Sequence, residues 1–137
     1  MKRCLIVIVL IGLITTGYAQ TGLKGVVWVL SKIDDTKEKA SINLNHSHSI
    51  LKFEDSTYTG YGCNGFSGKY KIVGNKINFI GGMQITDNAC GNPNDYKAQN
   101  YVLDNFIQLE YKLEGESLIL TKAGEVIFTY NKQKPEK

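Results

Sequence analysis

The sequence predicts a mainly β (α+β) fold: a small antiparallel β-barrel-like sheet with one packed α-helix. Three observations lead to this fold class. Short runs rich in β-branched and aromatic residues are separated by Gly, Asn and Asp turn signals along most of the chain. One segment near residue 100 instead carries apolar residues at helical spacing. Strands and helices do not alternate, so the parallel sheet of a βαβ protein is not expected.

The chain has 137 residues, a length that suits one domain. Lys2 and Arg3 precede an apolar run that ends in small residues at Ala19, a pattern typical of an export signal. We therefore expect a signal peptide over residues 1–19 and one domain over residues 20–137. The apolar run is short for a membrane-spanning helix. The expected protein is exported, periplasmic or secreted, with no transmembrane segment after signal cleavage.

Most of the apparent positive charge belongs to this signal. Its removal takes away Lys2 and Arg3 and no acidic residue, so the formal net charge falls from +3 to +1. A nearly neutral chain lacks the basic surface with which proteins bind nucleic acid. Cys4 lies at the start of the apolar run, whereas a lipid-bearing cysteine is expected at its end, so we predict no lipid anchor.

The first predicted strand covers residues 23–31 and contains Trp28, the only tryptophan of the chain. Residues 32–49 are mostly polar and are predicted to form a surface loop, with a short strand at 42–44 as the alternative. Gly74-Asn75 is expected to be a two-residue turn, and Gly81-Gly82 is expected to end a strand. The remaining predicted strands cover residues 50–53, 57–61, 66–73, 76–80, 83–86, 111–113, 117–121 and 126–130.

A single helix is predicted over residues 93–108. Asn92 is a favourable N-cap, and Pro93 suits the first helical position. The residues that recur with helical spacing are expected to lie on the sheet, and they are Tyr96, Gln99, Val102, Leu103, Phe106 and Leu109.

A glycine-rich stretch follows the second predicted hairpin strand and holds the most distinctive residues of the chain. Gly62, Gly65 and Gly68 fall within seven residues, which indicates a sharp change of chain direction; Asn64 is expected to satisfy backbone groups of that turn. Cys63 lies in the same stretch, and Cys90 follows 27 positions later.

The two cysteines allow three interpretations. A structural disulfide is favoured because export places Cys63 and Cys90 in an oxidising compartment. Two buried free thiols are the second interpretation. A redox-active pair is the third and has least support, since the sequence contains no Cys-x-x-Cys motif.

Candidate metal and catalytic residues are few. His46 and His48 lie in a polar stretch, and Asp34 and Asp35 could join them, but zinc and copper sites need three or four rigidly held ligands. Asp87 and Asp95 flank Cys90, although a hydrolase would need two carboxylates held close together. No nucleophile elbow, phosphate loop or zinc-binding helix motif is present. We therefore expect no metal, no cofactor and no catalytic residue.

The glycine-rich stretch, the downstream threonine and cysteine, the Asn92-Pro93 helix start and the closing strands resemble the META/HslJ-like domain family. The residues that carry the likeness as motif positions are Trp28, Gly62, Cys63, Asn64, Gly65, Phe66, Gly68, Thr86 and Cys90. The resemblance implies a small barrel-like sheet with a helix, and roles in stress tolerance, envelope upkeep and secretion without an agreed activity. Many members read Thr-Arg-Met-x-Cys where this chain has Thr86-Asp87-Asn88-Ala89-Cys90, so a role that depends on that basic residue is not expected here.

These observations lead to a functional expectation. We expect a non-catalytic exported envelope module that binds another protein or serves envelope stress and upkeep. The alternative is a barrel that binds a small apolar ligand such as a lipid in its interior. An enzyme is the third possibility. The sequence does not identify the envelope partner or the ligand.

Overall fold

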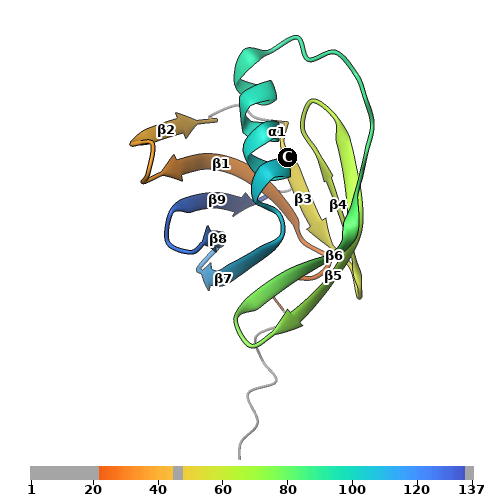
Figure 1. Ribbon diagram of the computed structural model, residues 1–137. Coiled ribbons are helices and arrows are strands. Elements are labelled where there is room, and N and C mark those ends of the chain that lie inside the picture. The colour runs from red at the N-terminus through yellow and green to blue at the C-terminus, as the bar shows by residue number, and fades with distance from the viewer. Residues whose placement is uncertain (1–21, 45–47, 135–137) are drawn as a thin grey trace, which may run out of the picture.

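The computed structural model describes residues 22–44 and 48–134, in which nine strands and one helix form a closed barrel (Figure 1). Eight strands pair antiparallel in a ring that closes between β1 and β9, and β2 extends from the edge of β1. The predicted fold class is thereby confirmed. The predicted signal peptide lies outside the described residues. The elements are β1 (Val27–Asp35), β2 (Ala40–Asn43), β3 (Ile50–Phe53), β4 (Thr57–Tyr61), β5 (Gly65–Val73), β6 (Lys76–Ile85), α1 (Pro93–Asn105), β7 (Gln108–Glu114), β8 (Ser117–Lys122) and β9 (Val126–Lys132).

Strand β1 begins later and runs further than predicted. Its first residues pair with β3, its last residues pair with β2, and its other edge pairs with β9. The prediction of a surface loop from residue 32 was therefore wrong. Ile33 and Asp35 face inward and are buried, while the alternate residues Lys32 and Asp34 are more exposed, so the polar residues belong to an alternating strand.

The β5–β6 hairpin contains a wide bulge. Ser67 pairs with Gln84 and Lys69 pairs with Ile80, so residues 81–83 of β6 lie opposite Gly68 alone. The prediction that Gly81-Gly82 ends the strand was wrong, because β6 continues through the bulge to Ile85. Both glycines have positive φ, at 75° and 82°, a conformation that side chains beyond Cα disfavour.

Helix α1 begins as predicted and ends earlier. The side chain of Asn92 accepts a hydrogen bond from the amide of Asn94 at 2.9 Å, and the helix ends at Asn105 rather than at residue 108. Phe106, which caps its C-terminus, is buried as predicted. Two other predictions were wrong, since Tyr96 is 55% exposed and Leu103 is only half-buried.

The helix rests on the barrel through part of the predicted face, because Gln99 and Val102 are buried as expected while Tyr96 and Leu103 are not. Its buried residues are Ala98, Gln99, Val102 and Asn105. This stripe is turned away from the side that carries Tyr96 and Leu103, two residues that lie one above the other seven positions apart. The two outer hydrophobic residues therefore flank the contact instead of forming it.

Large side chains fill the barrel interior. The ring of Phe106 contacts Phe66 of β5, Phe79 of β6 and Phe128 of β9, with centroid distances of 6.2, 4.7 and 5.7 Å. Phe106 therefore joins the end of α1 to strands in different parts of the barrel wall; Figure 1 shows how α1 lies relative to those strands. The largest fully buried side chains are Tyr58, Tyr130, Phe53, Phe128, Leu23, Leu30, Ile33, Leu51, Ile77, Leu109, Leu118 and Leu120.

Candidate functional site

Asn64 links three segments at the glycine-rich corner between β4 and β5. Its side-chain Oδ1 accepts hydrogen bonds from the amide of Asn88 at 2.6 Å and from the Thr86 hydroxyl at 3.1 Å. Its backbone amide donates to Oε1 of Gln99 in α1 at 2.7 Å. Asn64 is buried, and buried polar groups stabilise a fold only when they are paired as these are. The residue therefore fixes the corner, the segment after β6 and the helix relative to one another.

The other residues singled out at this corner also have structural contacts. Cys63 and Cys90 form a disulfide with a Cα–Cα distance of 5.4 Å, which supports the favoured interpretation of the two cysteines. The Thr86 hydroxyl accepts a hydrogen bond from the amide of Gly65 at 3.1 Å, and the amide of Gly62 donates to the Asn64 carbonyl at 3.0 Å. These contacts hold the corner in place, and we call this disulfide and its hydrogen bonds the clamp.

Three further motif residues lie outside this clamp. Trp28 is buried in the core, where its indole Nε1 donates to the carbonyl of Leu23 at 3.1 Å. Phe66 and Gly68 follow the corner along β5, and both face the interior. Phe66 contributes to the aromatic cluster around Phe106.

The acidic residues considered as metal ligands are engaged elsewhere. Asp34 accepts from Lys32 and from the Ser41 hydroxyl, at 2.9 and 2.8 Å. His48 is exposed, and His46 lies outside the described residues. Across residues 22–44 and 48–134, no group of three or more His, Cys, Asp or Glu side chains is placed to hold a metal ion.

Asp35 ties the β1–β2 turn to the helix. Its carboxylate accepts from the amides of Lys37 and Glu38 at 3.1 and 3.0 Å and from the Tyr101 hydroxyl at 3.1 Å. The hydrogen bond from the Glu38 amide is the largest cause that lowers the pKa of Asp35 below its usual value of 3.8, and the Tyr101 and Lys37 bonds add to it. These bonds satisfy the carboxylate, so Asp35 has a structural role in this geometry.

Asp87 and Asp95, the carboxylates beside Cys90, do not line a common cavity. Asp95 lines a surface hollow next to the disulfide together with His48 and Tyr61, and Asp87 is exposed outside that hollow. The paired carboxylates that a hydrolase requires are not assembled here.

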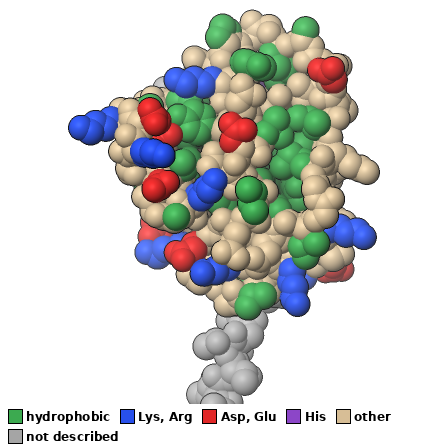
Figure 2. Space-filling model, viewed as in Figure 1, with side chains coloured by type: hydrophobic (Ala, Val, Ile, Leu, Met, Phe, Trp, Pro, Cys, Tyr) green, Lys and Arg blue, Asp and Glu red, His purple; other side chains and the backbone are tan. Residues whose placement is uncertain are grey.

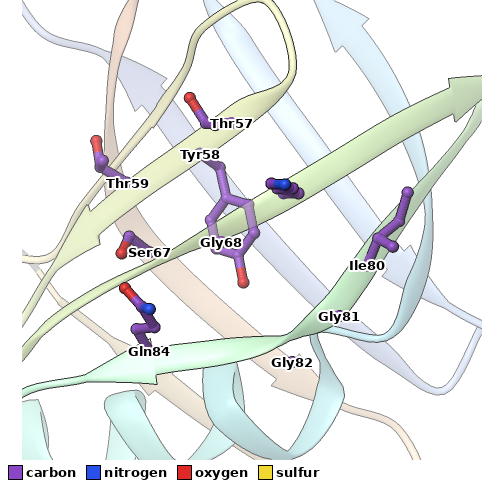
Figure 3. Close-up of a pocket in the computed structure, with 10 residues that line it drawn as sticks. Thr57, Tyr58, Thr59, Ser67, Gly68, Ile80, Gly81, Gly82 and Gln84 are labelled. Atoms are coloured by element: carbon purple, nitrogen blue, oxygen red, sulfur yellow. The ribbon is translucent and has the colours of Figure 1, made fainter.

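The most distinctive cavity lies on the outer wall, at the bulge between β5 and β6 (Figure 3). We call it the bulge groove. It has a volume of about 390 Å³ and is lined by Thr57, Tyr58, Thr59, Ser67, Gly68, Lys69, Ile80, Gly81, Gly82 and Gln84. A second hollow continues it toward the glycine-rich corner and shares Thr59, Ser67 and Gln84 with it. The two together form one elongated depression along β4, β5 and β6.

The register of the strands explains which side chains reach the bulge groove. Thr57 pairs with Lys69, and Thr59 pairs with Ser67, so these four residues share the outward face of β4 and β5. Ile80 and Gln84 extend this face onto β6, on either side of the bulge. The outer wall of the groove is therefore made of hydroxyl, amide and ammonium groups beside one exposed isoleucine.

Tyr58 reaches the bulge groove from the inside of the barrel. The residue is only 1% exposed, and its ring makes an edge contact with Phe79 at 4.8 Å. The ring crosses Gly68, and its hydroxyl points toward the Gly81-Gly82 segment (Figure 3). Burial raises the pKa of Tyr58 above its usual value of 10.0, so the hydroxyl keeps its proton at neutral pH.

Sequence reasoning did not identify the bulge groove. Tyr58 was assigned to a strand without a special role, and Gly81-Gly82 was interpreted as a strand end. The only signal was the glycine pair itself, because adjacent glycines inside a strand pattern often mark a bulge. The alignment of Tyr58, Gly68 and the bulge depends on strand register, which the local sequence does not specify.

The fold and these sites define a small antiparallel barrel domain with a helix over one end, a disulfide-clamped corner and an open groove on its wall. The chain belongs to the META domain family, whose model matches residues 21–134. A comparison with curated proteins finds no match. In the described residues, no helix is long and hydrophobic enough to cross a membrane.

Solved structures share the fold. A protein from Burkholderia xenovorans, determined by NMR, has a TM-score of 0.66 and 19% identity, with 82% of this chain and 85% of that chain covered. A second NMR structure has a TM-score of 0.61 and 22% identity, with 80% and 90% covered. A crystal structure of a DUF4847 family protein from Bacteroides vulgatus has a TM-score of 0.54 and 13% identity, with 83% and 96% covered. At these identities the likeness concerns the fold alone.

Proposed function

We propose that this META-domain protein is a non-catalytic, exported module of the cell envelope that acts by binding another protein. The observation that carries the proposal is the bulge groove, an open depression on the barrel wall with both polar and apolar lining. Its length along three strands suits an extended segment of a partner better than a small compact molecule.

The packing of the barrel favours this role over the binding of an apolar ligand in the interior. A barrel of eight strands is wide enough either to be filled by side chains or to hold one small ligand. Here aromatic rings from β5, β6, β9 and the end of α1 meet inside the barrel. A lipid would have to displace these contacts, so the outer wall is the better candidate surface.

A non-catalytic role is supported by the state of the polar residues. The buried polar or charged side chains are Asp35, Ser49, Asn64, Gln99 and Asn105. Asp35, Asn64 and Gln99 take part in hydrogen bonds that connect elements of the fold, and Asn105 donates to the Tyr101 carbonyl within α1. A general acid or base needs a free titratable group. Asp35 is the one carboxylate among these residues, and it accepts three hydrogen bonds from the fold.

The surface charge is compatible with a protein partner. Figure 2 shows hydrophobic side chains gathered beside α1 on the side of β4 and β5, with acidic and basic side chains mixed over the rest of that face. Mixed charge of this kind gives no extended positive field for nucleic acid.

Export is the second part of the proposal and has its own test. The Cys63–Cys90 disulfide suits an oxidising compartment, and the first residues have the pattern of a signal peptide. Protein purified from its native exported fraction should have an intact mass that starts at or near Gln20. A mass that retains Met1, or one that includes a diacylglycerol group, would contradict the proposed route.

Binding is tested by affinity capture from envelope fractions with three versions of the protein. Ile80 is 47% exposed in the bulge groove, and Val73 is 60% exposed at the β5–β6 turn, away from the residues that line it. Ile80→Asp should abolish recovery of the partner, whereas Val73→Asp should recover it as the wild type does. Identical recovery with all three proteins would reject the groove as the binding surface, and a reproducible absence of any specific partner would reject the protein-binding role.

A further inference from the structure

The bulge groove has a chemical character that narrows the kind of partner it can accept. Lys69 is the only charged residue among its ten lining residues. In the described part of the chain, Lys69 is absent from the ion pairs, which join Lys24, Lys32, Lys52 and Lys112 to acidic neighbours. The groove therefore presents one cation without a carboxylate of its own.

The remaining polar groups of the groove can each donate a hydrogen bond. Thr57, Thr59 and Ser67 supply hydroxyls on the outward face, and Gln84 supplies an amide beside the bulge. Hydroxyl groups can donate to an oxyanion, and charge-assisted hydrogen bonds are stronger than neutral ones. A ligand with acceptor atoms and negative charge matches this set.

Tyr58 adds a donor at the inner end of the groove. Its ring is almost fully buried. The hydroxyl points from the interior side toward the bulge, through the space that Gly68 leaves free (Figure 3). A side chain at position 68 would close this passage, because an added Cβ would lie 2.7 Å from the Tyr58 hydroxyl oxygen. The bulge of Gly81 and Gly82 opens the wall at the same point.

We propose that the bulge groove is a carboxylate-binding subsite, in which the Tyr58 hydroxyl and the Lys69 ammonium together bind an acidic side chain of an extended partner segment. This proposal rests on the protein-binding role given above and specifies the partner's chemistry. A single lysine suits a singly charged carboxylate better than a phosphate, whose higher charge usually meets several cations or a nest of amides. Ile80 beside the subsite favours an apolar residue next to the acid.

The test uses the mature protein and two matched peptides, N-acetyl-Ile-Glu-Ile-amide and N-acetyl-Ile-Gln-Ile-amide. Binding is followed by the amide NMR shifts of the protein during titration. We expect the Glu peptide to shift the Lys69, Gly81, Gly82 and Gln84 amides in a saturable way. It should bind about tenfold more tightly than the Gln peptide. A ratio of this order corresponds to the usual free-energy contribution of a hydrogen bond to a charged group.

Two variants assign the effect to the proposed groups. Tyr58→Phe keeps the ring and removes the hydroxyl, and Lys69→Gln removes the charge at an exposed position. Each should remove most of the preference for the Glu peptide. Tyr96→Phe, on the exposed side of α1, should leave the preference unchanged. Thermal unfolding checks that Tyr58→Phe is folded. If Tyr58→Phe does not fold, the preference of Lys69→Gln for the Glu peptide decides the test.

The possible outcomes separate this proposal from the protein-binding role. Equal affinity for both peptides, or shifts outside the groove, would overturn the carboxylate subsite, and Ile80-dependent capture of a partner would still stand. Preference for the Glu peptide without any captured partner would support the subsite and reject the envelope role. If sodium acetate binds as tightly as the Glu peptide, the site serves free small carboxylates, and the extended peptide segment is overturned.

Discussion

At the scale of single residues, Tyr58 and Gly68 depend on each other. They are opposite one another on β4 and β5, and the tyrosine ring lies across the glycine. A Cβ at position 68 would lie within 2.9 Å of three atoms of the tyrosine side chain, two of the ring and the hydroxyl oxygen. The missing side chain is therefore a packing requirement as well as the opening through which the hydroxyl reaches the bulge groove.

Gly68→Ala should destabilise the protein by about 1–3 kcal/mol, the usual cost of forcing extra volume into a packed site. Gly91→Ala is the matched control, because a Cβ there would meet no atom within 4 Å. It should change the free energy of unfolding by less than about 0.5 kcal/mol. Urea unfolding of both variants measures the difference, and equal effects would contradict the close packing of Tyr58 on Gly68.

Asp35 makes stability depend on pH. Its folded pKa is lowered, first by the Glu38 amide, so the ionised carboxylate stabilises the fold above its unfolded value of about 3.8. This contribution is lost as the pH falls below 3.8 and through the folded pKa. Asp35→Asn should therefore be less stable than the wild type at pH 7, and the gap should narrow in acid.

The control for this prediction is Asp87→Asn, which changes an exposed aspartate. Urea unfolding at pH 7 and at about pH 3 gives the free energy of unfolding of each variant and of the wild type at both pH values. A gap between Asp35→Asn and the wild type that stays constant over this range would show that the carboxylate bonds do not contribute as described.

At the scale of elements, α1 is held by its C-terminal end. Phe106 is 5% exposed and its ring lies among three others, whereas Tyr96 in the first turn is 55% exposed. Phe106→Ala should cost about 3–5 kcal/mol, as large core truncations do. Tyr96→Ala should cost less than about 0.5 kcal/mol. Chemical unfolding compares them, and a larger loss for Tyr96 would mean that the opposite face of the helix is packed.

The disulfide ties the start of this helix to the glycine-rich corner. It joins residues 27 positions apart, and a loop of that size should contribute about 3–4 kcal/mol to stability by limiting the unfolded chain. The double variant Cys63→Ala, Cys90→Ala should lose about this amount in urea. A reducing agent should weaken the wild type and leave the double variant unchanged. No effect of reduction on the exported wild-type protein would contradict the bond.

Elements with strong local signals could be predicted from the sequence. The β3–β4 hairpin has the expected bounds, because alternation and turn residues are properties of the segment itself. The end of β1 could not be recognised in this way, since its polar residues become part of a strand only by pairing with β2 and β9. The buried face of α1 was predicted only in part: Gln99 and Val102 are buried as expected, but Tyr96 is exposed, because the exact face depends on which part of the barrel the helix covers.

The candidate sites likewise differ in whether a local sequence signal marks them. Cys63, Asn64, Gly65 and Thr86 were found because unusual residue types cluster in the sequence, and the structure brings them together. The bulge groove needs a register shift between β5 and β6 that places Tyr58 below Gly81-Gly82. Register is decided by the whole sheet, so no local pattern could reveal the groove.

At the scale of the whole molecule, the barrel is closed and its interior is filled. Closure leaves the eight ring strands without open edges, and the interior is occupied by large side chains. One feature of the outer wall is the depression that follows β4, β5 and β6. The central claim is that a partner protein occupies this depression in the native envelope.

Photo-crosslinking in the native host tests this claim most directly. A photoreactive amino acid replaces Ile80 in the bulge groove in one strain and Val73 at the β5–β6 turn in another. The account predicts one reproducible crosslinked product from position 80 and none from position 73. Crosslinking from both positions alike, or from neither while the protein is present and folded in the envelope, would contradict it.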